Sequence, residues 1–161
     1  MATFAGVYRQ YAPGIYRYAL SLTGNPADAE DLVAETFLRA WATPTPLHLE
    51  TVRSYLAAIV RNLFLEGARK SSRERVLDQD YADARDLAAD QESRDVYVRL
   101  RELVAELPET TRSALLMHSV IGLTYTEISR VLGIPEGALR VRVCRARVEL
   151  AAQLGRTEVC G

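Results

Sequence analysis

Metal-binding and redox-active side chains are scarce in this 161-residue chain. It has two cysteines, Cys144 and Cys160, and two histidines, His48 and His118, which lie far from both cysteines in sequence. This spacing matches no metal-ligand pattern. Two reduced thiols are therefore the favoured interpretation, with a redox or metal role as the minor alternative.

Long apolar segments are lacking too. No apolar run approaches the roughly 18 residues needed to span a bilayer. The first eleven residues show no basic region followed by an apolar stretch, so no secretory signal is visible. We expect a cytoplasmic protein. The 48% hydrophobic and 25% charged residues are typical of a globular chain with one ordinary domain or two small ones.

The sequence also lacks the residue sets that enzymes use. It shows no paired carboxylates, no nucleophile–base set, no glycine-rich phosphate loop and no metal cluster. We therefore expect a protein that is not an enzyme and that needs no cofactor, metal or small-molecule substrate.

Charge is present but segregated, which the net charge of −1 conceals. Basic residues dominate positions 53–75, acidic residues dominate positions 78–95, and positions 140–147 hold four arginines and no acid. Local patches, and not the sum of all charges, set the field that a phosphate experiences. Two basic segments separated by an acidic connector therefore indicate two places where nucleic acid could bind.

Helical periodicity runs through almost the whole chain and predicts an all-α fold of two small helical domains. We expect helices at about 3–23, with a kink or a break at Pro13-Gly14, and then at 26–41, 51–70, 93–106, 109–120, 125–132 and 136–150. Asn25 and Thr51 are the expected N-caps of two of these helices. The predicted domains are 1–76 and 94–155, with an acidic flexible linker at 77–93 and a tail at 156–161.

A helix-turn-helix is predicted between about Thr124 and Leu150. Thr124 and Glu127 have the spacing of a capping box, and Gly133-Ile134-Pro135 has the composition of a tight turn. In the second helix four apolar residues share one stripe, which should face the core: Leu139, Val143, Ala146 and Leu150.

The opposite face of that second helix predicts contact with DNA. It carries Gly137, Val141, Cys144 and Val148, flanked by Arg140 and Arg145. Such a helix can enter the major groove, where arginine bonds guanine edges or clamps phosphate. A merely solvated arginine face is the alternative, and the apolar Val148 leaves a second packing contact possible.

Both halves of the chain resemble one known family, the extracytoplasmic-function (ECF) sigma factors. The C-terminal motifs are Leu107-Pro108-Glu109, Arg112, the run 122–128, the run 132–135, Arg140, Arg142 and Arg145-Ala146-Arg147. Residues 29–37 resemble that family's polymerase-binding helix. Arg53-Ser54-Tyr55-Leu56, Ile59, Arg61-Asn62 and Arg69-Lys70 resemble its promoter-melting helix. The resemblance covers about residues 4–76 and 94–152, in the right order.

The resemblance implies a bacterial subunit that binds core RNA polymerase and directs it to promoters. In this family the first domain docks on a coiled coil of the largest polymerase subunit and opens the minus-10 element. The second domain reads the minus-35 element, and the linker threads toward the RNA exit channel. No further region before or between the domains is seen, which fits the minimal ECF type. An anti-sigma factor, which can tether such a protein to the membrane, commonly wedges between the domains.

The resemblance also assigns roles to individual residues. Polymerase binding falls to Asp28, Asp31, Leu32, Glu35 and Arg39. Minus-10 recognition falls to Tyr55, Arg61, Asn62, Arg69, Lys70 and Arg73. Minus-35 recognition falls to Thr124, Pro135, Glu136, Gly137, Arg140, Val141, Cys144 and Arg145. For Tyr55 a place in the core is favoured over direct stacking on a base.

The chain departs from the family pattern at several positions. Ala34 replaces a usual glutamine, Tyr55 a usual tryptophan and Glu66 a usual aspartate. Ala138 and Val141 replace a threonine and a serine, so two polar contacts to the minus-35 element are missing. Two alternatives stay open: a stand-alone helix-turn-helix regulator, and a sigma-like protein whose main task is to be held by an anti-sigma factor.

Overall fold

All regular elements are helices in the residues that the computed structural model describes, which are 3–43, 48, 51–71 and 91–155, with the backbone alone for 69–71. In chain order they are α1 (Phe4–Thr23), α2 (Pro26–Ala42), α3 (Val52–Ser71), α5 (Gln91–Ala105), α6 (Glu109–Leu116), the π-helical turn η1 (Met117–Ile121), α7 (Tyr125–Leu132) and α8 (Glu136–Gln153). The all-α prediction is confirmed. The predicted linker falls mostly outside the described residues.

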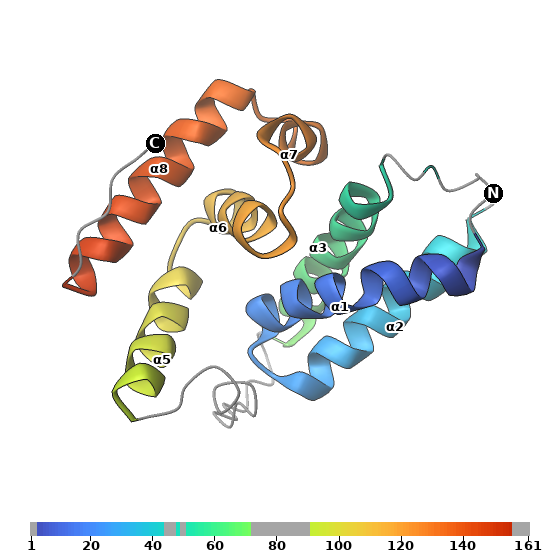
Figure 1. Cartoon of the computed structure of the whole chain (residues 1–161), viewed down its shortest axis with the longest axis horizontal. Coiled ribbons are helices and arrows are strands. Elements are labelled where there is room, and N and C mark those ends of the chain that lie inside the picture. Colours follow the sequence, from blue (N-terminus) through green and yellow to red (C-terminus); the bar gives the residue numbers. More distant parts are fainter. Residues whose placement is uncertain (1–2, 44–47, 49–50, 72–90, 156–161) are drawn as a thin grey trace.

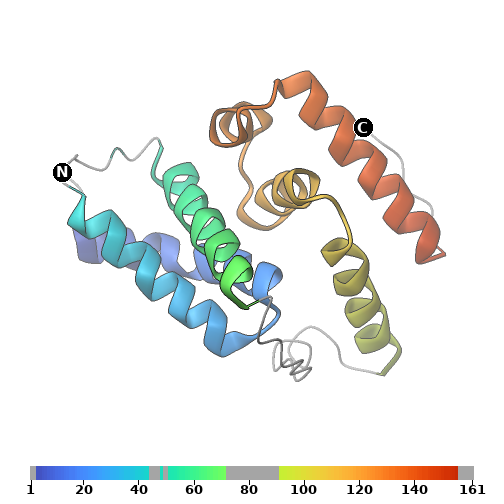
Figure 2. The same cartoon turned by 180° about the vertical axis from the view of Figure 1, so that it is seen from behind.

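The helices form two groups that lie against each other. Helices α1, α2 and α3 pack together, and α5, α6, α7 and α8 form the second group (Figure 1). Helix α6 and η1 lie between α8 on one side and the α1–α3 group on the other, as the reverse view also shows (Figure 2). The second group therefore presents α6, η1 and α7 to the first group and leaves one face of α8 on the outside.

The start of α2 is fixed by its capping residues, as the sequence predicts. The Asn25 side chain accepts hydrogen bonds from the backbone N–H groups of Ala27 and Asp28, at 2.8 and 3.2 Å. Pro26 occupies the first turn, where the N–H that it lacks is not needed. Gly24, at φ 69°, ends α1 in the left-handed conformation that a glycine adopts without strain.

Helix α1 is continuous through Pro13, so the expected break into two short helices does not occur. A proline inside a helix removes one hydrogen bond and costs about 3 kcal/mol. Here Pro13 is exposed, while Val7 on one side of it and Ile15 and Tyr18 on the other are buried in the same core. Burial of both halves against one surface outweighs the missing bond.

The predicted helix at 109–120 is not α-helical along its whole length. Its α-helical part ends at Leu116, and the chain continues as η1 until Gly122, at φ 82°. The backbone N–H of Leu123 donates to the carbonyl of Met117 at 3.0 Å. The wider π-turn shifts the register of the side chains relative to an α-helix, and both Met117 and Leu123 are fully buried.

One hydrophobic core spans both groups of helices. It includes Tyr18 of α1, Leu56 of α3, Met117 of η1, Ile128 of α7 and Leu139 of α8, each fully buried. The two groups are therefore packed against each other through apolar side chains as well as through the polar contacts described below.

Candidate nucleic-acid interface

The predicted capping box is present at the start of α7. The Thr124 hydroxyl accepts from the backbone N–H of Glu127 at 3.1 Å, and the Glu127 carboxylate accepts from the backbone N–H of Thr124 at 2.9 Å. Ser129 donates to the carbonyl of Ile134 at 2.7 Å and so joins α7 to the turn before α8. These contacts fix the angle at which α8 leaves the turn.

Helix α8 has the two faces that its sequence predicts. Leu139, Val143, Ala146 and Leu150 are all buried. Gly137, Arg140, Val141, Arg145 and Val148 are exposed. The stripe that holds the fold is thus separate from the face proposed to meet DNA, which is open along the helix.

Arg140 is held in place by two neighbours, Glu136 and Tyr125. Its guanidinium lies 3.1 Å from the Glu136 carboxylate and 4.8 Å from the centre of the Tyr125 ring. The Tyr125 ring stacks on His118 at 4.4 Å. Glu136 also accepts a hydrogen bond from Thr126 at 2.9 Å. The Arg140 guanidinium therefore lies over the Tyr125 ring, which stacks on His118, and is not a loosely solvated group.

The same contacts keep Glu136 ionised. Hydrogen bonds from Arg140 and then from Thr126 hold the pKa of the Glu136 carboxyl below its usual value. Tyr125 and Thr126 were not among the predicted site residues. An aromatic residue and a hydroxyl directly after the cap were the only signals that could have indicated them.

The other two arginines of the basic run bond back to the protein. Arg142 donates to the Thr110 hydroxyl at 3.4 Å, and Arg147 donates to the Ser119 hydroxyl at 3.2 Å. Both partners belong to the α6–η1 segment. Of the four arginines at 140–147, only Arg140 and Arg145 therefore belong to the exposed face opposite the buried stripe, as the sequence predicts.

Cys144 departs from the expectation of a reduced thiol. It is half-buried on α8 and disulfide-bonded. Spacing along the chain argues only against a metal site, because it does not show which sulfurs can meet in space. Cys160 lies outside the described residues.

The three predicted minus-10 residues whose side chains the structure describes, Tyr55, Arg61 and Asn62, do not share one open face. Asn62 is exposed, whereas Tyr55 is half-buried and its hydroxyl lies 3.1 Å from the Thr43 hydroxyl. Arg61 is turned toward the second group of helices. The side chains of Arg69 and Lys70, and all of Arg73, lie outside the described residues.

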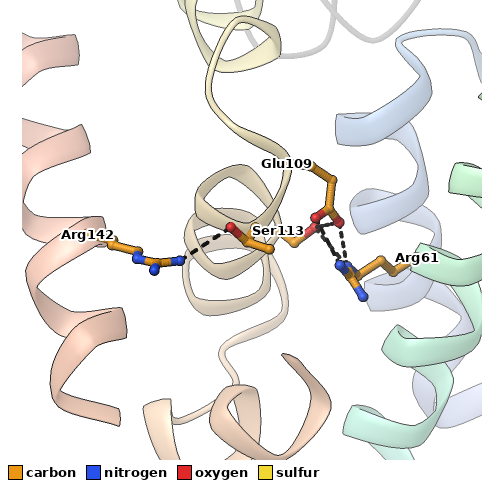
Figure 3. A network of polar contacts seen from close by, with 5 residues as sticks. Arg61, Glu109, Ser113 and Arg142 are labelled. Atoms are coloured by element: carbon orange, nitrogen blue, oxygen red, sulfur yellow. Dashed lines mark hydrogen bonds and ion pairs between the residues drawn. The ribbon is translucent and has the colours of Figure 1, made fainter. Parts of the chain in front are cut away.

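Arg61 of α3 makes a polar contact with α6, across the two groups of helices. Its guanidinium donates to both carboxylate oxygens of Glu109, at 2.6 and 2.9 Å, and to the Ser113 hydroxyl at 3.3 Å. Figure 3 shows Arg61 facing Glu109 and Ser113 on one side of α6, with Arg142 on the other side. Ser113 donates in turn to Glu109 at 3.1 Å.

Burial acts on the ionisable groups around this contact. Burial raises the pKa of the Tyr18 phenol, which lies beside Ser113, far above its usual range. Burial opposes ionisation of Glu109 as well, but hydrogen bonds from Arg61 and Ser113 outweigh it and hold the pKa of that carboxyl below its usual value. Arg61 and Glu109 therefore form a charged pair at neutral pH.

The predicted polymerase-binding residues lie on the outer side of α2. Asp28, Asp31, Glu35 and Arg39 are exposed, and Glu35 pairs with Arg39 at 3.1 Å. Leu32 is half-buried and packs against the core. Between these charges Leu38 is 61% exposed, and Trp41 at the end of the helix is 64% exposed. These two apolar residues were missed, because helical spacing alone does not separate an exposed apolar residue from a buried one.

Neither a membrane-spanning helix nor a metal-ligand cluster is present in the described part of the chain. It contains no helix long and apolar enough to cross a bilayer. Nor do three or more histidine, cysteine, aspartate or glutamate side chains gather there as metal ligands would.

Solved structures of similar fold include two protein complexes. CnrH in complex with the cytosolic domain of CnrY matches with a TM-score of 0.70 and 22% identity, over 94% of this chain and 87% of that chain. The sigma factor RpoE of Bartonella quintana, in complex with the anti-sigma factor NepR, matches with a TM-score of 0.69 and 24% identity, over 94% of this chain and 96% of that chain.

Sequence comparisons are more specific. The Sigma-70 region 2 family matches residues 7–74, and the Sigma-70 region 4 family matches residues 97–150. The ECF RNA polymerase sigma factor SigM of Bacillus subtilis is 31% identical over 96% of both chains. SigE of Mycolicibacterium smegmatis, another ECF factor, is 34% identical over 97% of this chain, which spans 63% of that relative's length. The chain therefore belongs to the ECF RNA polymerase sigma factors, a family of transcription initiation factors.

Proposed function

We propose that this chain recruits core RNA polymerase through the outer side of α2, places the exposed face of α8 on a minus-35 element, and captures the minus-10 strand with α3 and the segment that follows it. The observation that carries this proposal is the outward face of α8. There Arg140 is preset by Glu136 and Tyr125, while the opposite stripe anchors the helix in the core.

At the minus-35 element the first turn of α8 supplies backbone as well as side chains. Pro135 caps the helix without a side-chain hydrogen bond, so the first N–H groups at Glu136 and Gly137 can meet a phosphate. Gly137 is exposed, and nothing would contact a Cβ there, so the DNA backbone can approach closely. Arg140 and Arg145 supply the charge, and Thr124 and Cys144 border the same face.

At the minus-10 element the exposed Asn62 is the best-placed described residue. Tyr55 acts indirectly, since its hydroxyl contacts the hydroxyl of Thr43, the residue that follows α2. Arg69, Lys70 and Arg73 would follow the strand through its phosphates. Arg61 joins them only when its contact with Glu109 is broken.

For polymerase binding, α2 offers charge around an apolar centre. Asp28, Asp31 and Glu35 attract a basic partner helix, and the exposed Leu38 and Trp41 supply area that loses water on docking. A central apolar contact within a charged rim is the usual anatomy of a protein interface. We expect the complex to form in the cytoplasm, where core polymerase is.

An anti-sigma factor is the second partner that we propose. One structure of similar fold holds the anti-sigma factor NepR on the sigma factor RpoE, and the other holds the cytosolic domain of CnrY on CnrH. A stand-alone regulator is disfavoured, because both sigma regions are matched and α2 has an exposed acidic and apolar surface with no role in such a protein.

Two variants separate recruitment from DNA reading. Reversing the charges of Asp31 and Glu35 to lysine should abolish capture of core polymerase and leave the helical circular dichroism unchanged, because both side chains are exposed. Arg140→Ala should leave polymerase capture intact and weaken promoter binding by the holoenzyme. If charge reversal leaves capture unchanged, the α2 surface is wrong; if Arg140→Ala leaves promoter binding unchanged, the α8 face is wrong.

A further inference from the structure

Val141 is an exposed apolar residue on the face of α8 proposed to meet DNA. Its side chain is 46% exposed, and it is separate from the buried stripe. It adjoins Arg140 and lies one helical turn before Arg145. Burial in the protein therefore does not account for a valine at this position.

The shape of valine gives this exposed position a definite geometry. In an α-helix a β-branched side chain has one strongly preferred rotamer, so its two methyl groups point in a fixed direction. The neighbouring Arg140 is itself held by Glu136 and Tyr125. The pair thus presents a fixed cation beside a fixed apolar surface.

The major groove contains one apolar group that such a surface fits. Each thymine carries a C5-methyl there, and apolar side chains contact it, whereas valine can form no hydrogen bond to a base edge. We propose that Val141 is a specificity-determining residue that contacts the C5-methyl of a thymine in the minus-35 element. This proposal rests on the proposed function, since it needs α8 in the major groove.

Deoxyuridine substitution tests the contact, because it removes the methyl group and leaves base pairing intact. Holoenzyme binding is measured on promoter DNA in which each minus-35 thymine, on either strand, is replaced in turn by deoxyuridine. With the unaltered chain, one position should weaken binding about fourfold, the value expected for one buried methyl group. With Val141→Ala that position should lose its effect.

Val98→Ala is the matched control, because Val98 is an exposed valine on α5 (36% exposed), outside the proposed DNA face of α8. It should keep the deoxyuridine effect. If no thymine shows the effect, or if Val141→Ala retains it in full, the Val141 assignment is wrong. Failure of the proposed function would look different: Arg140→Ala would then bind promoter DNA as well as the unaltered chain.

Arg61 of α3 and Glu109 of α6 form an ion pair between the two groups of helices. The Arg61 guanidinium binds the Glu109 carboxylate in a bidentate manner. The Arg61 side chain is only 18% exposed and the Glu109 side chain 27%. Arg53 of α3 adds a hydrogen bond to the carbonyl of Ile121 at 3.1 Å. A Cβ at Gly24 would collide with Arg101 of α5, so the two groups also approach closely there.

A guanidinium that binds a carboxylate in this bidentate way cannot bind a phosphate at the same time, because both ligands use the same N–H donors. We infer that the closed arrangement masks part of the minus-10 surface, with Glu109 occupying Arg61 in place of a promoter-strand phosphate. Separation of the two groups then has to precede full engagement of the melted strand. This inference rests on the proposed minus-10 role of Arg61.

Glu109→Gln tests the masking, because it removes the charge and keeps the shape. The exposed Glu102, which pairs with Arg99 on its own helix, provides the control variant Glu102→Gln. Two quantities are measured on the whole chain without polymerase: its affinity for a fluorescent single-stranded DNA of mixed sequence, and the fluorescence transfer between dyes on α2 and α8. Glu109→Gln should raise the affinity severalfold and lower the transfer, and Glu102→Gln should change neither.

Two results would overturn the inference. Unchanged transfer in Glu109→Gln would show that this pair does not hold the groups together. A lower fluorescence transfer without tighter DNA binding would show that the closed arrangement does not block the DNA-binding surface. Arg61→Ala distinguishes failure of the minus-10 role itself: an opened Arg61→Ala chain that binds the strand as tightly as Glu109→Gln would exclude Arg61 as a DNA ligand.

Discussion

Replacing Arg140 by alanine should weaken promoter binding and also make it less sensitive to salt. Each phosphate contact contributes about 0.9 to the negative slope of log affinity against log salt concentration. If Arg140 makes one such contact, the slope should become shallower by about 0.9. When the salt concentration rises fourfold, from roughly 50 to 200 mM, the ratio between the affinities of the unaltered chain and the variant should therefore shrink about 3.5-fold.

The loss of affinity at one salt concentration can be estimated from the contacts of Arg140. A hydrogen bond to a charged group contributes about 1.5–3 kcal/mol. Removal of the guanidinium also leaves Glu136 with Thr126 as its described partner and no cation to neutralise it, and a carboxylate on the DNA face repels phosphate. We therefore expect at least about a tenfold weakening at low salt, since 1.4 kcal/mol corresponds to a factor of ten.

The assay is fluorescence anisotropy of holoenzyme on promoter DNA at several salt concentrations, with two controls. Arg99→Ala removes an exposed arginine of α5, which pairs only within its helix in the described part of the chain, and should leave both affinity and slope unchanged. Arg140→Lys should keep the slope, because a point charge remains, and lose part of the affinity with the guanidinium fork. An Arg140→Ala variant with unaltered slope and affinity would refute the assignment of the α8 face.

Thr124→Ala breaks the capping box of α7 and should lower the free energy of unfolding, measured in urea titrations, by about 1 kcal/mol. The control Thr126→Ser, at an exposed position, should lower the free energy of unfolding by less. The pKa of Glu109 is depressed in the folded chain, so its stabilising contribution should be complete above the usual carboxyl pKa and be lost as the pH falls through the depressed value. Glu109→Gln should flatten this acidic limb of the stability profile, and an unchanged limb would show that another carboxyl causes it. Leu139→Ala removes a fully buried side chain and should destabilise the chain by about 2–5 kcal/mol in the same titrations; a smaller loss would mean that α8 is not anchored through this stripe.

The helix-turn-helix was predictable from sequence because its determinants are local. Thr124 and Glu127 satisfy each other within one turn of helix, and the stripe from Leu139 to Leu150 repeats with the helical period. The start of α2 at Asn25-Pro26 followed from local rules as well. Such features need no knowledge of the rest of the fold.

The features that were missed depend on long-range packing. Nothing near Arg61 in sequence indicates that its partner is Glu109, which lies in a different helix group. The continuity of α1 through Pro13 depends on a core shared by both halves of the helix, and the platform of Tyr125 under Arg140 depends on how α7 meets α8. Sequence periodicity describes one helix at a time and does not specify these contacts.

The most direct test of the central claim is run-off transcription with purified core RNA polymerase, this chain and a library of genomic fragments from the bacterium that encodes it. The account predicts transcripts from a defined set of start sites that share a minus-35 and a minus-10 element. It also predicts that these transcripts disappear when Asp31 and Glu35 are reversed in charge, and that they decline with Arg140→Ala. Transcripts that do not depend on the chain, or start sites that both variants use unchanged, would contradict it.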